Sequence, residues 1–345
     1  MSAKQMAPII GMLKSSVAIS AYERRLEMDS RELKFPIVCM MTLLIWMEIK
    51  HLTLDALEQS LTGRGGQAIL RNLGMPVGKD GRRMRPSKSW ISTFKNHYYP
   101  EFAKLLNAEM AESIMGSLGD DVIYTCDSTP LEASRYSVWA EFNPHYRIKM
   151  AKAHIVMANG IPMFVRYSNG NGGDNPALIE LLDMFDGTGK NGCFLTDGSY
   201  DSCETFAKVF RQTGLVMATN TGKTGVVHRE AEWANVVRRY NRLNGERGFV
   251  PSSRASPAFI LRFLESHGER ELAGWAIRNL NMRRPEKIKK ELARKRHVCE
   301  TVHHAMKRWV NLDVRGLHRR HVWKGLSLKM FACQLLCIVF KPYDC

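Results

Sequence analysis

The sequence predicts a mixed α/β protein, in which a sheet flanked by helices follows an N-terminal helical domain and is interrupted by a helical insertion. Three observations predict this class. Residues 1–118 carry only helical patterns, β-branched runs begin after residue 119, and Arg294–Trp309 has the pattern of one late helix. We therefore expect four segments: a helical N-terminal domain at 1–118, a first core segment at 119–220, a helical insertion at 221–290 and a second core segment at 291–345.

The chain is strongly basic, because Lys and Arg number 50 against 34 acids, for a formal net charge of +16. Such an excess favours a polyanionic partner, and double-stranded DNA is the first expectation. An anionic membrane surface is the alternative, but the longest uncharged runs, Pro36–Met47 and Met330–Phe340, are too short to span a bilayer. The eight cysteines form no CxxC pair. We therefore expect a reduced, cytoplasmic protein associated with the nucleoid, with no membrane partner.

The N-terminal 118 residues have two open interpretations. Leu33–Lys50 is apolar nearly all round and should be buried, and Ser87 can cap a later helix. The basic loop Gly74–Pro86 lies between helical patterns. Short helices with a basic loop are typical of a DNA-reading module of the helix-turn-helix kind. A helical bundle that only packs on the rest of the chain fits the pattern equally well.

The core begins with the strand Val122–Asp127, which is rich in β-branched residues and ends on an acid. Two strands follow at Lys152–Ala158 and Ile161–Ser168, and the Asn159-Gly160 pair between them is typical of a two-residue hairpin turn. A helix, a strand, a second helix and a last strand are then expected, at Ala177–Phe185, Gly192–Asp197, Cys203–Gln212 and Leu215–Asn220.

The 71 residues from Asn220 to Glu291 (291 − 220) are too many for a plain loop in a compact domain. They contain helical patterns such as REAEWANVVRRYNRL, so we expect a helical lobe that interrupts the core. The apolar stretch Leu326–Phe340 should form a last helix that covers the sheet.

Strand, hairpin, helix, strand, helix, strand and a late helix is the element order of the RNase H-like fold. That fold carries an acid on the first strand, a second just after the fourth strand and a third on the late helix. Asp127, Asp197 and Glu300 hold those positions here, separated by 70 (197 − 127) and 103 (300 − 197) residues. Asp127 could instead merely end a strand. Asp201 competes with Asp197, but it is better explained as the cap of the next helix.

The late helix has a charged face of its own. At about 100° per residue, Arg296, Glu300 and Lys307 point at about 0°, 40° and 20°. Alone, this pattern is that of a solvated face with ion pairs four residues apart. Together with the two aspartates, it indicates that Glu300 is the third carboxylate and that Arg296 and Lys307 bind DNA phosphates. A metal cluster of Cys299 with neighbouring histidines is less consistent with the irregular cysteine positions.

These motifs resemble those of DDE transposases of prokaryotic insertion sequences, in the group with the Tyr-Arg-Glu-Lys motif. The resemblance lies in CDSTPLEAS around Asp127, in LTDGSYDSCE around Asp197 and in RHVCETVHHAMK around Glu300. Two positions depart from the family pattern. Ala293 stands where the motif has its Tyr, and Ser199 follows Gly198 in the second motif. The contribution of that Tyr to binding the transposon end is therefore missing or supplied elsewhere.

The resemblance implies a transposase that cleaves DNA at terminal inverted repeats and joins the ends to target DNA, as a homodimer on paired ends. Asp127, Asp197 and Glu300 would be both the catalytic residues and the metal ligands, and Arg296 and Lys307 would bind DNA. Converging carboxylates repel one another, and two Mg²⁺ or Mn²⁺ ions would relieve this. Two alternatives stay open: a metal-dependent DNA endonuclease, and a non-catalytic DNA-binding protein derived from a transposase.

Overall fold

The computed structural model of the chain describes residues 2–134, 136–185, 191–219, 223–245, 249–251, 254–312 and 319–340. Packing divides the chain into two compact units. The first unit comprises Met1–Gly116, Leu131–Met150 and His303–Cys345, and the second comprises Ser117–Pro130 and Ala151–Val302. The three candidate carboxylates and Arg296 all belong to the second unit, so their geometry can be described within it.

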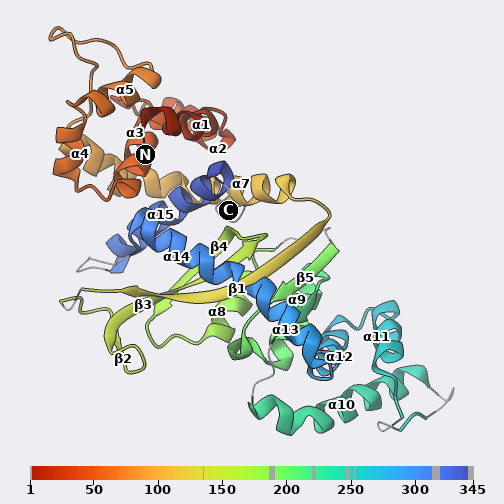
Figure 1. Ribbon diagram of the computed structural model, residues 1–345. Coiled ribbons are helices and arrows are strands. Elements are labelled where there is room, and N and C mark those ends of the chain that lie inside the picture. The colour runs from red at the N-terminus through yellow and green to blue at the C-terminus, as the bar shows by residue number, and fades with distance from the viewer. Residues whose placement is uncertain are drawn as a thin grey trace. The chain divides into compact units, whose positions relative to one another are not determined.

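The first unit begins with a run of helices (Figure 1). Serine and threonine side chains cap several of them, as at Ser87, whose hydroxyl accepts a hydrogen bond from the Trp90 N–H. The apolar stretch expected to be buried forms a helix with almost no exposed residue. The helices are α1 (Ala3–Lys14), α2 (Val17–Met28), α3 (Ile37–Ile49), α4 (Leu54–Ser60), α5 (Arg64–Asn72), α6 (Lys88–Thr93) and α7 (Tyr99–Ser117), with a π-helical turn at Phe94–Tyr98.

The last helix of the chain, α15 (Arg319–Phe340), is longer than the expected Leu326–Phe340. It was expected over the sheet, but its packing partners include α3 and α1, and Ser327 shares a hydrogen bond with the Tyr99 hydroxyl. By length and composition, Val322–Phe340 could cross a membrane, but 61% of it is buried inside the protein. This burial is typical of a core helix.

The sheet has the predicted mixed character. Its strand order is β2-β3-β1-β5-β6, with β4 paired to β3. The β1–β5 and β5–β6 pairs are parallel, and the β3–β4 pair is antiparallel. With its flanking helices, this sheet confirms the predicted RNase H-like class. The strands are β1 (Asp121–Glu132), β2 (Glu141–Asn143), β3 (Ile148–Ala158), β4 (Ile161–Asn169), β5 (Asn191–Leu195) and β6 (Val216–Ala218).

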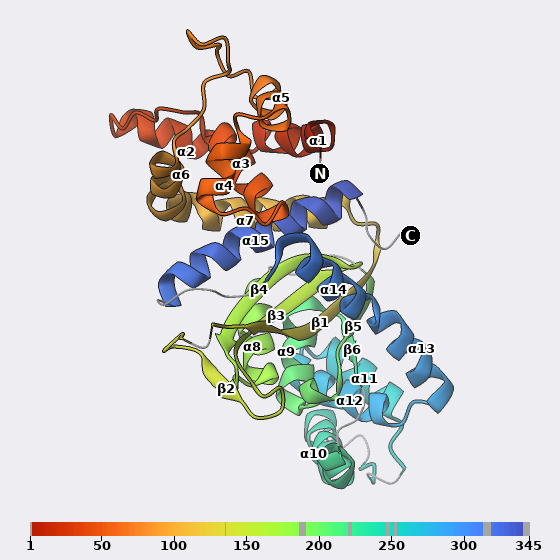
Figure 2. The same cartoon turned by 60° about the vertical axis from the view of Figure 1, so that its left-hand side comes forward.

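The β3–β4 connection is the predicted two-residue turn. Asn159 and Gly160 both have positive φ, at 47° and 77°, which is the backbone that a type I′ turn requires. Asn159 also holds β1, because its side-chain oxygen accepts a hydrogen bond from the Ile123 N–H at 2.9 Å. Helix α8 (Asp174–Leu182) packs on β4, and α9 (Cys203–Thr213) packs on β6 (Figure 2).

The insertion forms three helices, α10 (Lys223–Asn244), α11 (Pro257–Ser266) and α12 (Arg270–Met282). They share an apolar core that includes Trp233, Tyr240 and Ile260. The third helix also packs extensively on α9 and on β6, so the insertion joins the core of the second unit through α12. Asn220, the expected end of the last strand, lies outside the described residues.

The late helix is interrupted, so its prediction as one continuous helix was wrong. Helix α13 (Glu286–Arg296) ends before His297, and α14 (Val298–Val310) begins after it. The backbone tightens at His297, whose N–H lies 3.3 Å from the Ala293 carbonyl and 3.1 Å from that of Arg294. No Gly or Pro marks the break, so helical periodicity gave no signal of it.

Candidate active site

Asp127 lies in the middle of β1 and not at its end, which corrects the expected strand boundary. The strand continues because its far end still pairs, with the Ala133 N–H donating to the Lys149 carbonyl at 2.9 Å. The Asp127 side chain is only 16% exposed. One of its oxygens accepts a hydrogen bond from the Ser128 N–H at 2.8 Å, so the carboxylate is oriented by its own strand.

Asp197 follows β5 by two residues. The β1–β5 pairing keeps one offset from Asp121–Asn191 to Thr125–Leu195, 70 residues (191 − 121). The same number of residues separates Asp127 from Asp197 (197 − 127), so each acid lies two residues after the last pair of this ladder, Thr125–Leu195. Asp197 caps the 3₁₀ turn Gly198–Tyr200, where its side chain accepts a hydrogen bond from the Ser199 N–H at 2.8 Å.

Asp201, the competitor of Asp197, is not the cap of α9. Ser202 caps that helix by accepting a hydrogen bond from the Thr205 N–H. The Asp201 carboxylate is instead buried against Arg278, whose Nε donates to it at 2.9 Å. The predicted cap was wrong because an arginine 77 residues away takes the carboxylate.

Arg296 joins two of the three candidate carboxylates. Its Nη1 donates to Asp127 at 3.1 Å, and its Nη2 donates to Glu300 at 3.1 Å. The contact between Arg296 and Glu300 is the ion pair, four residues apart, that the charge pattern taken alone indicated. The other carboxylate oxygen of Glu300, Oε2, lies within hydrogen-bond distance, 2.9 Å, of Nδ1 in the His297 ring. The Glu300 side chain is 52% exposed.

The electrostatics of Asp127 reflect both of the other acids. Burial raises its pKa to about 6, and the negative charges of Asp197 and Glu300 add to this effect. The Ser128 N–H and the Arg296 charge act in the opposite direction. The pKa of Glu300 is lowered, chiefly by its contact with His297. Three carboxylates thus share one electrostatic neighbourhood with one guanidinium.

These side chains suit a hard divalent cation in donor chemistry, because all three offer only carboxylate oxygens. In the part of the chain that the structure describes, however, no three His, Cys, Asp or Glu side chains lie close enough to share one ion. Arg296 stands between Asp127 and Glu300, while Ser199 holds Asp197. The structure therefore brings the acids into one neighbourhood but not into one coordination sphere.

The remaining predicted site residue, Lys307, is exposed on α14, seven residues after Glu300 (307 − 300). Its position belongs to the first unit. Cys299, the alternative metal ligand, is fully buried, and burial raises the pKa of its thiol to about 12. A neutral thiol of this kind is a poor metal ligand.

A buried ionic cluster next to the site was not predicted. Asp174, the first residue of α8, lies 3.3 Å from the His154 ring and 3.4 Å from Lys152. Burial alone would raise its pKa, but the nearby His154 ring and the charge of Lys152 outweigh this and lower it to about 2. Ser128, the neighbour of Asp127, also acts to lower the pKa of Asp174. The sequence signal for this cluster was the presence of Lys152 and His154 on the otherwise apolar strand KAHIVMA.

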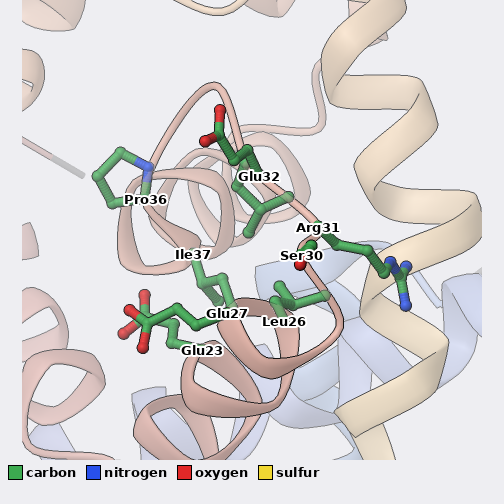
Figure 3. Close-up of a pocket in the computed structure, with 9 residues that line it drawn as sticks. Glu23, Leu26, Glu27, Ser30, Arg31, Glu32, Pro36 and Ile37 are labelled. Carbon is green, nitrogen blue, oxygen red and sulfur yellow. The ribbon is translucent and has the colours of Figure 1, made fainter.

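A pocket of about 590 Å³ lies in the first unit, between α2 and the start of α3 (Figure 3). Glu23, Glu27 and Glu32 are among its lining residues. Arg31 also lines it, but its guanidinium turns toward α7, where it donates to both oxygens of Glu101 at 3.0 Å. Because the carboxylates dominate its charge, this surface is unsuited to phosphate.

In a comparison with known protein families, the family described as "Transposase DDE domain" matches residues 119–335. The matched range begins just before β1 and contains Asp127, Asp197, Glu300 and the intervening insertion. A comparison with curated proteins found no significant match.

Proposed function

Because the chain belongs to the family of transposase DDE domains, we propose that it is the DNA transposase of an insertion sequence. It cleaves DNA at the terminal inverted repeats of its element and joins the freed 3′ ends to target DNA. The observation that carries this proposal is the arrangement around Arg296, where carboxylates from β1 and α14 meet one guanidinium and Asp197 adds its charge.

Asp127, Asp197 and Glu300 would hold two Mg²⁺ or Mn²⁺ ions. When bound, such ions activate water or a 3′-hydroxyl and stabilise the leaving oxygen in phosphodiester displacement. The protein supplies the negative charge that attracts them, and the first two acids each follow the last β1–β5 pair by two residues. No side chain is required as a nucleophile. Arg296 and Lys307 position the DNA strand, and Arg296 also limits carboxylate repulsion before metal binds.

Double-stranded DNA is the proposed partner of both units. In the N-terminal 118 residues, the exposed Lys79, Arg82 and Arg85 in the loop between α5 and α6 provide a basic surface. The pocket beside α2 is acidic and offers no basic surface. We therefore assign contact with the terminal repeats to the loop between α5 and α6. In the second unit, α13 is basic and has no buried residue. A homodimer on paired ends and a nucleoid location belong to the same proposal.

The chain is also assigned to the group with the Tyr-Arg-Glu-Lys motif, although Ala293 replaces the Tyr. Ala293 lies on α13, three residues before Arg296 (296 − 293). An alanine there offers neither a ring nor a hydroxyl to DNA, so Arg296 and Lys307 carry the contacts of this motif.

The proposal is tested with DNA taken from both flanks of the element and with Mg²⁺ added or chelated. Asp127→Asn, Asp197→Asn and Glu300→Gln should each abolish cleavage and leave DNA binding within a few fold. Glu291→Gln is the matched control, because Glu291 lies on α13 and pairs with the exposed Lys295. It should cleave like the unaltered protein.

Strand transfer separates the remaining classes. Joining of cleaved ends to a target plasmid supports a transposase, and cleavage without joining identifies an endonuclease. DNA binding with no Mg²⁺-dependent cleavage by the unaltered protein identifies a non-catalytic DNA-binding protein. Cleavage by Glu300→Gln but not by Glu291→Gln would assign the third acid to α13.

A further inference from the structure

Helix α12 of the insertion contacts the segment that carries Asp197. This helix buries three polar side chains in an otherwise apolar pattern, Arg278 at 2% exposure, Asn279 at 1% and Asn281 at 2%. Buried polar groups are costly unless they are hydrogen-bonded. The hydrogen-bond partners of Arg278 and Asn281 therefore indicate which segments α12 holds in place.

The first contact runs through Thr219, which follows β6. The side-chain amide of Asn281 donates to the Thr219 carbonyl at 2.8 Å, and its oxygen accepts from the Thr219 N–H at 3.4 Å. Asn281 thus occupies both main-chain groups of Thr219. The Thr219 hydroxyl in turn donates to the main-chain carbonyl of Asp197. One chain of hydrogen bonds links α12 to the backbone of the second carboxylate.

The second contact holds the other end of the same segment. Arg278, three residues before Asn281, donates to both oxygens of Asp201, through Nε at 2.9 Å and Nη2 at 3.4 Å. Its Nη1 donates to Glu232 of α10. Asp197 begins the 3₁₀ turn and Asp201 ends it. The turn is therefore held at both ends by a single helix.

The docking of α12 leaves little room for movement. Gly274 faces α9, and a Cβ built there would lie 2.3 Å from the Cα of Ala207. Only glycine allows this approach of the two helices. The contacts made by Arg278 and Asn281 are thus set by close packing as well as by hydrogen bonds.

We propose that α12 positions Asp197, with Arg278, Asn281 and Thr219 as positioning residues. This inference rests on the proposed function in one respect, namely that Asp197 is one of the metal-binding carboxylates. It gives the insertion a role inside the core, where it holds the turn that aims the second acid.

The test uses the full-length protein and the Thr219 hydroxyl, which is the weakest link that can be removed with little change of shape. Thr219→Val removes the hydrogen bond to Asp197, and Thr219→Ser keeps it. Thr42→Val is the control, because Thr42 is a fully buried threonine whose hydroxyl donates to the Val38 carbonyl in α3. Two readouts are measured, hydrogen–deuterium exchange of the peptide spanning 197–201 and the Mn²⁺ concentration for half-maximal DNA cleavage.

In Thr219→Val, exchange of this peptide and the Mn²⁺ midpoint should each rise roughly 3- to 10-fold, the range expected from one lost hydrogen bond. Thr219→Ser and Thr42→Val should stay near the unaltered protein, and DNA binding should not change. Equal exchange and equal Mn²⁺ midpoints in Thr219→Val and Thr42→Val would overturn the proposal.

If Thr219→Val does not fold, Asp201→Asn is the second variant, because Glu232 still compensates Arg278. The same rises are expected, and their absence overturns the proposal. Should the unaltered protein show no Mn²⁺-dependent cleavage, the proposed function fails, and the exchange comparison still decides whether α12 holds the turn.

Discussion

The guanidinium of Arg296 lies 3.1 Å from a carboxylate oxygen of Asp127, although 169 residues separate the two in the chain. The same guanidinium contacts Glu300. One cation therefore compensates two acids that would otherwise repel each other across a partly buried site. This relationship bears on stability as well as on the proposed chemistry.

Replacing Arg296 should lower stability and increase the effect of metal. In Arg296→Gln without metal, the free energy of unfolding should fall by about 1–3 kcal/mol, because two charge-assisted hydrogen bonds are lost. Mn²⁺ should then raise the melting temperature more in this variant than in the unaltered protein, since it relieves an uncompensated repulsion. Thermal denaturation in EDTA and in Mn²⁺ measures both effects.

Lys295→Gln is the control for this experiment, because Lys295 pairs only with the exposed Glu291 among the described residues. Such a pair contributes little, about 0.5 kcal/mol or less. An equal metal-induced shift in Arg296→Gln and Lys295→Gln would contradict the compensating role of Arg296.

The salt dependence of DNA binding should report the exposed face of α13. Lys287, Lys290 and Arg294 are spaced three and four residues apart on one side of the helix, and none of them makes an ion pair with a described residue. Replacing all three by Gln should reduce the slope of log affinity against log salt by about three, because each phosphate contact contributes about 0.9. Fluorescence anisotropy at several salt concentrations measures the slope.

A charge-preserving triple variant is the matched control, with Lys287→Arg, Lys290→Arg and Arg294→Lys. It should keep the slope of the unaltered protein. An unchanged slope in the Gln variant would exclude this face of α13 from the DNA contact.

The buried Asp174 should make stability depend on acid. Its pKa is lowered from 3.8 to about 2 in the folded protein, so the unfolded chain binds the proton more readily. The resulting stabilisation, about 2 kcal/mol, is complete above the unfolded pKa near 4 and is lost as the pH falls toward 2. Asp174→Asn should therefore be less stable than the unaltered protein near neutral pH, and the difference should shrink in acid.

Urea denaturation at several pH values between 2 and 7 measures this difference. Asp55→Asn serves as the control, because Asp55 is 65% exposed and pairs with an exposed lysine. Its effect should stay below about 0.5 kcal/mol at every pH. A constant difference across the range for Asp174→Asn would refute the linkage.

Gly192 should be irreplaceable at the start of β5. Its φ is +135°, and a Cβ there would lie 1.9 Å from the Val122 carbonyl oxygen. Gly192→Ala should cost about 3 kcal/mol or more, since the alanine must distort the pairing of β5 with β1. Gly325→Ala in α15 meets nothing within 4 Å and should add about 0.5–1 kcal/mol. Chemical denaturation of both variants makes the comparison, and equal stabilities would contradict it.

Local patterns were sufficient to predict the fold class. The Asn159-Gly160 pair predicted the hairpin turn because both residue types tolerate the positive φ that such a turn requires. The alternation of β-branched and helical stretches predicted the mixed sheet with flanking helices. The contact between Arg296 and Glu300 matches the four-residue spacing of an ion pair on a solvated helix face, and it does not test the binding of metal by Glu300. The roles of the three acids, and of Arg296 and Lys307 toward DNA, stay predictions.

Tertiary structure decided the features that depend on partners distant in the chain. The extension of β1 past Asp127 depends on the pairing at Lys149, and the true role of Asp201 depends on Arg278. The helix break at His297 contains no Gly or Pro, so local sequence did not predict it. Sequence periodicity records only which residues share a face. Which buried charge meets which partner is set when the helices and strands pack, because only then does desolvation select the pairs that can compensate one another.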